Sequence, residues 1–167
     1  MSIFEAFLQP SEVLLASRFF IRLELQVTGG NAIADATFLE CQGFERTQDC
    51  ISITEVTPKQ WAKASRGQVA ITKIPGNAKT TNLVLRRGLT NSKLLWNWFK
   101  EVEVGNWYDN RAEGSLSIYD QAGIEQARYN FEGAWPMRYQ ASGLSARSSE
   151  IEIEELELAT EYLVRAA

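Results

Sequence analysis

The sequence contains no histidine. This absence excludes Ser-His-Asp and Cys-His catalytic sites, histidine-ligated metal sites and a histidine general base. Two other catalytic signatures are also missing: Gly29-Gly30 lacks the later glycine and lysine of a P-loop, and no G-x-S-x-G sequence occurs. We therefore expect no enzyme, with no catalytic, cofactor-binding or metal-binding residues.

Cysteine is scarce, with only Cys41 and Cys50 in the chain. Two thiols cannot complete a tetrahedral zinc site without histidine, so only carboxylates would remain as further ligands. We expect two reduced thiols in a cytoplasmic protein, and a local disulfide between them is the alternative.

Long hydrophobic runs are missing as well. No stretch of 18 apolar residues occurs, so we expect no membrane span. The N-terminus has no basic region, and Glu5 and Glu12 interrupt its apolar stretch, so it does not read as a signal peptide.

What is present is ordinary for one globular domain over residues 1–167. The chain is 45% hydrophobic and 23% charged, with 11 glycines and 4 prolines, so it can bury a core and is not a linker. The net charge of −4 argues against general nucleic-acid binding.

Alternating apolar residues predict several strands. Residues 21–27 alternate with period two, residues 36–42 could form a second strand, and residues 83–85 a short third one. Residues 115–119 and 124–131 flank a short glycine-containing loop, which predicts a hairpin that ends at Trp135-Pro136.

One helix is expected, over about residues 91–102. Thr90 or Asn91 can cap it, Gly105 ends it, and its apolar face carries Leu94, Leu95, Trp98 and Val102 at helical spacing. Its two tryptophans read as packing residues. The predicted fold class is mainly β, a small β-barrel or sandwich with this single flanking helix.

Acidic residues dominate the segment 150–158. Ile151 and Ile153 occupy odd positions, whereas Leu156 and Leu158 occupy even ones. A β-bulge near Glu154-Glu155 would keep both pairs on one face. The row of glutamates is expected to be solvated or paired with basic groups, for which the segment 55–80 of the same subunit or of a neighbour is the obvious source.

The segment 45–80 is the least regular part and is interpreted as an extended loop or hairpin. Residues 51–54 and 69–72 resemble short strands, residues 57–67 could hold one helical turn after Thr57-Pro58, and residues 73–76 form a turn. Residues 55–80 contain five basic residues and one acidic residue, which favours an acidic partner surface.

Residues 1–17 read as an apolar arm, irregular and broken by Pro10. Its side chains could pack on the parent domain or on a neighbouring subunit, and composition does not decide between the two. A different class of protein is suggested by aromatic residues expected in loops or at strand ends: a monomeric β-sandwich that binds carbohydrate. Those residues are Trp61, Trp107, Tyr108, Trp135 and Tyr139.

A series of short motifs, in this order, resembles the tail tube proteins of contractile phages and of phage-derived contractile injection systems. They are Lys73-Ile74-Pro75-Gly76, residues 83–90 (LVLRRGLT), residues 95–99 (LWNWF), residues 111–120 (RAEGSLSIYD), residues 131–136 (FEGAWP) and residues 153–159 (IEELELA).

The resemblance implies a β-barrel subunit that forms hexameric rings stacked head-to-tail into a rigid inner tube. It further implies a surrounding sheath whose contraction drives the tube through a target envelope, baseplate and tail-terminator partners, and a lumen that could hold cargo. Such a protein would be found in the cytoplasm of the producing cell within an assembled particle, or in a virion tail.

With this reading, the residues expected in contacts between subunits come from three places. They are the apolar arm, the basic segment and the acidic segment: Phe4, Phe7, Leu8, Lys59, Trp61, Lys63, Arg66, Glu152 and Glu154.

Overall fold

The computed structural model describes residues 14–27, 30–34, 37–60, 67–147 and 149–166. The chain divides into two compact units, one made of residues up to Phe44 together with Asn82–Ala167, the other of Glu45–Thr81. The second unit covers the segment that the sequence presents as an extended loop or hairpin.

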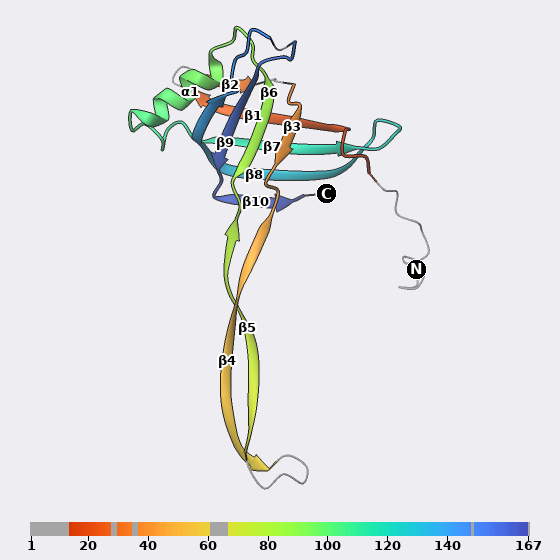
Figure 1. The fold of residues 1–167 in the computed structure, drawn as a ribbon, viewed down its shortest axis with the longest axis vertical. Coiled ribbons are helices and arrows are strands. Elements are labelled where there is room, and N and C mark those ends of the chain that lie inside the picture. The colour runs from red at the N-terminus through yellow and green to blue at the C-terminus, as the bar shows by residue number, and fades with distance from the viewer. Residues whose placement is uncertain (1–13, 28–29, 35–36, 61–66, 148, 167) are drawn as a thin grey trace. The chain divides into compact units, whose positions relative to one another are not determined.

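The first unit contains an eight-stranded sheet in the order β2-β1-β7-β8-β9-β6-β3, with β10 also paired to β8 (Figure 1). Every pair of neighbouring strands in this sheet, among the described residues, is antiparallel. The strands are β1 (Phe19–Val27), β2 (Gly30–Ala34), β3 (Glu40–Gln42), β6 (Leu83–Gly88), β7 (Ala112–Tyr119), β8 (Glu125–Ala141), β9 (Ile153–Ala159) and β10 (Tyr162–Arg165).

Strand β8 belongs to both halves of this sheet. Its first half pairs with β7 and β10, and its second half pairs with β9. A register shift opposite Ala112–Gly114 includes Gly133, whose φ of 63° suits glycine, and a second shift follows Pro136. These irregularities turn the strand, and β9, β6 and β3 therefore cross the direction of β1 and β7 (Figure 1).

The core lies between the two halves. Ile21, Leu23 and Leu25 of β1 are buried, as are alternate residues of β6 and β9, which is the pattern of strands covered on one face. The largest fully buried side chains are Phe131, Ile21, Leu23, Leu25, Leu83, Leu85, Leu95, Leu156, Leu158 and Pro136.

The prediction of a mainly β fold with one flanking helix is confirmed, although the sheet is not closed as a barrel. Within the described residues, its two end strands β2 and β3 are not paired with each other. Of the strand predicted over residues 36–42, the structure has only β3 (Glu40–Gln42) within the described residues, and β2 (Gly30–Ala34) lies before that range at the opposite end of the sheet. The predicted hairpin is β7–β8, but β8 continues past Trp135-Pro136 to Ala141 because the bulge lets it change partner.

Helix α1 (Leu94–Glu103) has Lys93 as its N-cap residue, and no side chain caps it, so the cap predicted at Thr90 or Asn91 is wrong. Leu95 and Trp98 are buried, and the Trp98 indole Nε1 donates a 2.6 Å hydrogen bond to the carbonyl of Asn110. Leu94 and Val102 are partly buried against the same core. Among the described residues, no helix is long and apolar enough to cross a membrane.

The second unit is a two-stranded antiparallel ribbon, β4 (Arg46–Gln60) paired with β5 (Gly67–Thr80), and the two strands twist around each other in Figure 1. The predicted short strands are therefore parts of two long ones. The helical turn starting at Pro58 is wrong over residues 57–60, which belong to β4. The predicted turn at residues 73–76 is also wrong, because a register shift absorbs Gly76 within β5.

The predicted bulge in β9 is absent. β6 and β9 pair without a break from Leu83–Leu158 to Gly88–Ile153, and the buried positions are Glu154, Leu156 and Leu158. Ile151 and Ile153 consequently lie on the other face, where Ile151 is 76% exposed. The bulge was inferred from apolar residues alone, and the strand instead buries a carboxylate that finds a cationic partner.

Candidate assembly interface

Three strand edges of the first unit have no pairing partner among the described residues. β2 and β3 end the main strand path, and β10 pairs with β8 on one side only. Each open edge presents backbone N–H and C=O groups that could pair with another chain. The first unit can therefore be extended by strands of a neighbour.

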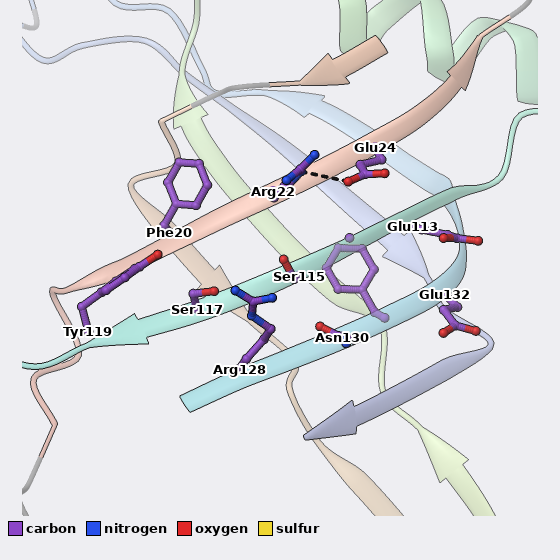
Figure 2. Close-up of a pocket in the computed structure, with 12 residues that line it drawn as sticks. Phe20, Arg22, Glu24, Glu113, Ser115, Ser117, Tyr119, Arg128, Asn130 and Glu132 are labelled. Carbon is purple, nitrogen blue, oxygen red and sulfur yellow. Dashed lines mark ion pairs between the residues drawn. The ribbon is translucent and has the colours of Figure 1, made fainter. Parts of the chain in front are cut away.

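One face of β1, β7 and β8 is polar. Figure 2 shows side chains from these strands on a single face, around a groove of about 400 Å³. Its charged and large residues are Phe20, Arg22, Glu24, Glu113, Tyr119, Arg128 and Glu132. The opposite face of the same strands carries core residues, so this half of the sheet is apolar on one side and hydrophilic on the other.

Charge is not evenly distributed over this polar face. Glu24 lies directly opposite Glu113 in the register, and Glu132 lines the same groove. Arg22 forms a 2.8 Å ion pair with Glu24. Like charges on neighbouring strands repel, so one row of this face is acidic and only partly neutralised.

The ribbon exposes apolar side chains on both of its faces. Ile51 lies opposite Ile74, and Val56 lies opposite Val69. Because Ile51 and Val56 are an odd number of residues apart, alternation places the two pairs on opposite faces. The exposed apolar residues are Ile51, Ile53, Val56, Val69, Ile71 and Ile74, with exposed fractions from 39% to 71%.

A two-stranded ribbon of this kind is marginal by itself in water. It also carries Lys73 and Lys79, of which Lys79 forms an exposed ion pair with Asp49 at 2.9 Å. Exposed apolar side chains in such number, with basic neighbours, are typical of an interaction surface.

The outer face of β6, β8 and β9 carries a row of ion pairs. Arg86 contacts Glu40 at 2.8 Å and Glu155 at 2.7 Å. Arg138 lies 3.6 Å from Glu155 and 3.7 Å from Glu157. The pKa of Glu40 is lowered mainly by its hydrogen bond from Arg86. The described acidic residues of β9 are thus paired within their own chain.

Glu154 is buried on the inner face of β9, with 3% of its surface exposed. It accepts hydrogen bonds from Arg87 Nε and, at 2.6 Å, from the Tyr139 hydroxyl. Burial, followed by this hydrogen bond, raises the pKa of Tyr139 to about 12. Tyr139 in turn packs edge-on to Trp96 of α1, with 5.1 Å between ring centroids.

Exposed aromatic residues gather after α1. Trp107 and Tyr108 are 44% and 63% exposed, and the Arg111 guanidinium lies 4.2 Å from the centre of the Tyr108 ring. Trp135 and Tyr139, expected in loops or at strand ends, lie within β8 instead. Of the predicted aromatic residues, Trp61 lies outside the described residues, and the four described ones do not all lie in loops.

Residues 17–164 match the family model described as T4-like virus tail tube protein gp19. The chain belongs to this family. It is a tail tube protein, a structural component of a phage tail or tail-like particle. No curated protein sequence matches the chain.

Solved structures share the fold of this tail tube protein. A chain of the extracellular contractile injection system PVC, in its extended sheath–tube complex, is 17% identical, with a TM-score of 0.69 and coverage of 100% of this chain and 99% of its own. A chain of the PVC sheath/tube terminator is 18% identical, with a TM-score of 0.71 and coverage of 95% and 100%. A chain of the anti-feeding prophage baseplate is 17% identical, with a TM-score of 0.68 and coverage of 93% and 97%.

Most interface residues predicted for the tail tube protein lie outside the described residues. These are Phe4, Phe7, Leu8, Trp61, Lys63 and Arg66. Lys59 belongs to β4. Glu152 has a buried Oε1 without a hydrogen-bond partner in the described part of the chain. A contact of any of these residues with another subunit stays a prediction.

The acidic segment finds cationic partners within its own subunit that its own sequence did not indicate. Among the described residues, the cations that pair with β9 are Arg86, Arg87 and Arg138, on the strands hydrogen-bonded to it. The signal was the adjacent pair Arg86-Arg87, since consecutive strand residues face opposite sides and one of them must face the core. Pairing of the acidic segment with segment 55–80 of a neighbouring subunit stays a prediction.

The thiols are free in the structure. Cys41 is partly buried, and burial followed by the charge of Glu40 raises its pKa to about 12, whereas Cys50 is exposed in the ribbon. In the described part of the chain, no three His, Cys, Asp or Glu residues gather as a metal site.

Proposed function

We propose that this tail tube protein forms hexameric rings that stack head-to-tail into a rigid, hollow inner tube. One observation carries the proposal: a sheet with open edges at β2 and β10 and one hydrophilic face, in a chain of the tail tube family. The number six is supported by the sixfold symmetrised baseplate structure of the anti-feeding prophage, which holds a chain of the same fold.

Ring formation follows from the open edges. If β10 of one subunit pairs with β2 of the next, the contact is heterologous, and repetition around an axis closes a ring in which neither of these two edges stays free. Closure would produce one continuous barrel shared by all subunits. The sheet face that packs on its own core cannot line a lumen, so the polar face in Figure 2 would do so.

Stacking is assigned to the ribbon and the N-terminal arm. The ribbon has apolar side chains on both faces and an excess of basic residues, while the chain as a whole carries a net charge of −4. An interface between rings would supply both a dry groove and acidic groups. The ribbon's two faces would be covered there, and the arm would cover the same joint.

The role we infer is mechanical and not enzymatic. Contraction of a surrounding sheath would drive the tube into a target envelope. The partners are the sheath, baseplate and tube-terminator proteins, as supported by neighbours from a sheath–tube complex, a baseplate and a terminator. Cargo would occupy the lumen, and assembly would take place in the cytoplasm of the producing cell.

Native mass spectrometry of the purified protein tests this proposal. We expect species at six subunits of 18.8 kDa and at multiples of six, together with tubes in negative-stain images. A protein that stays monomeric at micromolar concentration, or that closes rings of another size, would contradict it.

A further inference from the structure

Strand β9 and the two residues before it contain two competing apolar patterns. Ile151 and Ile153 have one parity, and Leu156 and Leu158 have the other. Side chains alternate along a regular strand, so an unbroken β9 buries only one of the two pairs. Both can be buried only if the alternation is interrupted between them.

The structure buries the two leucines and places the two isoleucines on the opposite face of the sheet. Leu156 and Leu158 are 1% and 0% exposed, while Ile151 is 76% exposed beside Gly88 on the outer face. The same parity turns Glu154 inward, where an apolar residue would ordinarily lie. The observed pairing therefore has the weaker hydrophobic pattern over the first half of the strand.

A bulge at Glu154-Glu155 would give the stronger hydrophobic pattern. Two residues of a bulged strand oppose one residue of its neighbour, and both can point to the same side. Glu154 and Glu155 would then both face solvent, and Ile153 and Ile151 would turn toward the core. This second arrangement uses the same strand neighbours and shifts residues 150–154 by one position.

Arg87 is the group that opposes the bulge. It is 6% exposed on β6, directly opposite Glu154, and its Nε donates to Glu154 Oε1. Turning Glu154 outward would leave a buried guanidinium without its carboxylate, which is strongly unfavourable. The Tyr139 hydroxyl, which also donates to Glu154, would lose its acceptor.

The observed arrangement also contains two destabilising features. Arg87 Nη2 and Glu152 Oε1 are buried without a hydrogen-bond partner in the described part of the chain. Buried unpaired polar atoms are destabilising, and a bulge would release Glu152 toward solvent. The unpaired Glu152 therefore favours the bulged arrangement, whereas the contact between Arg87 and Glu154 favours the straight one.

We infer that β9 is a two-state strand and that Arg87 selects its straight arrangement by holding Glu154 inside. This inference concerns the isolated subunit and does not depend on tube formation. The two states differ in the exposure of Ile151. Its side chain is exposed to solvent or to a partner when the strand is straight, and it is buried in the core when the strand is bulged.

The experiment uses Ile151→Cys as a reporter, with thiol alkylation quantified peptide by peptide so that Cys41 and Cys50 are followed separately. In the Arg87→Leu background we expect alkylation at position 151 to slow by about tenfold or more, because the side chain becomes buried in a folded protein. Hydrogen exchange over residues 150–159, measured without the reporter, should change in pattern while the rest of the sheet stays protected.

Two further variants serve as controls. Arg86→Leu removes an arginine from the neighbouring position, whose contacts with Glu40 and Glu155 lie on the outer face, and it should leave alkylation at position 151 unchanged. Arg87→Leu combined with Glu154→Leu makes the straight strand fully apolar on its inner face, and it should restore the fast alkylation of the parent.

Either of two results overturns the inference. Unchanged alkylation and exchange in Arg87→Leu would mean that no second arrangement is accessible. In the second result, Cys41 of Arg87→Leu is also alkylated rapidly and protection is lost throughout the sheet. Arg87 would then be needed only for folding, and a double variant that folds while Arg87→Leu does not would confirm this.

Discussion

Trp98 is the side chain on which α1 depends most. It is 2% exposed, and its indole N–H satisfies the carbonyl of Asn110, whereas Trp96 on the same helix is 42% exposed. We expect Trp98→Ala to lower the free energy of unfolding by about 3–5 kcal/mol, the range for deleting a large buried aromatic side chain. Chemical denaturation of the subunit measures this loss.

Trp96→Ala is the matched control, because it removes the same side chain type from the same helix at an exposed position. Its effect should be clearly smaller. If Trp98→Ala costs less than about 1 kcal/mol, the helix does not anchor the fold. Trp98→Phe should lie between the two, since it keeps an aromatic ring but leaves the Asn110 carbonyl without its donor.

Asp120 stabilises the β7–β8 turn in its charged form. It accepts hydrogen bonds from the Ile124 backbone N–H at 2.8 Å and from Gln126 Nε2 at 2.7 Å, and the first of these is the main cause that lowers its pKa below 3.8. A lowered pKa means that the stabilisation is complete above the unfolded-state value and is lost as pH falls through the folded-state value.

Asp120→Asn should therefore reduce the acid sensitivity of the protein. We expect the free energy of unfolding of the parent to fall more steeply than that of the variant as pH drops below about 4. Other carboxylates titrate in the same range, so the difference between the two curves is the quantity to measure. Parallel curves would show that the turn does not hold a charged Asp120.

At the level of single residues, apolar alternation predicted β1 and apolar helical spacing predicted the inner face of α1, because the polar side chains described on these two elements are at least partly exposed. Alternation failed at Glu154. A buried carboxylate is tolerated only if a cation faces it, and that cation, Arg87, comes from a strand 67 residues away in sequence. Pattern analysis within one strand does not contain this information.

Among the elements, the ribbon β4–β5 exposes apolar side chains that are not buried in the isolated subunit. We expect reversal of Lys59, Lys63 and Arg66 to Glu to leave the subunit folded, because exposed charges contribute little to stability. Tubes should become shorter or fail to form, and raised salt should weaken assembly of the parent by screening the same contacts. Tube length in negative-stain images and circular dichroism of the subunit measure the two effects.

Reversal of Lys73 and Lys79 is an informative comparison, because these basic residues lie within the described part of β5. If neither set of reversals changes tube length or its salt dependence, the ribbon does not carry the contact between rings. If the subunit itself unfolds, the charges are part of the fold and the assignment is equally wrong.

Elements were predicted well where local pattern and tertiary pairing agree. The β7–β8 hairpin and α1 were found from alternation, helical spacing and Gly105. The segment 45–80 was not, because Pro58, Pro75 and Gly76 are ordinary signals of turns, and a long ribbon with a register shift accommodates them inside strands. The length of β8 was missed for the same reason.

For the whole molecule, the mainly β class with one helix follows from composition and pattern, and the tail tube family follows from the order of short motifs. The open sheet does not. A barrel or sandwich was expected because the edge strands of a sheet need pairing partners. The described chain nevertheless leaves β2, β10 and β3 with open edges. A single sequence does not state whether an edge is closed within the chain or by a copy of it.

Cryo-electron microscopy of tubes grown from the purified protein tests the central claim most directly. The account predicts rings of six subunits in which β10 of each subunit pairs with β2 of the next, with Arg22, Glu24 and Glu113 facing the lumen. A tube with another symmetry, or rings in which these two strand edges do not meet, would contradict it.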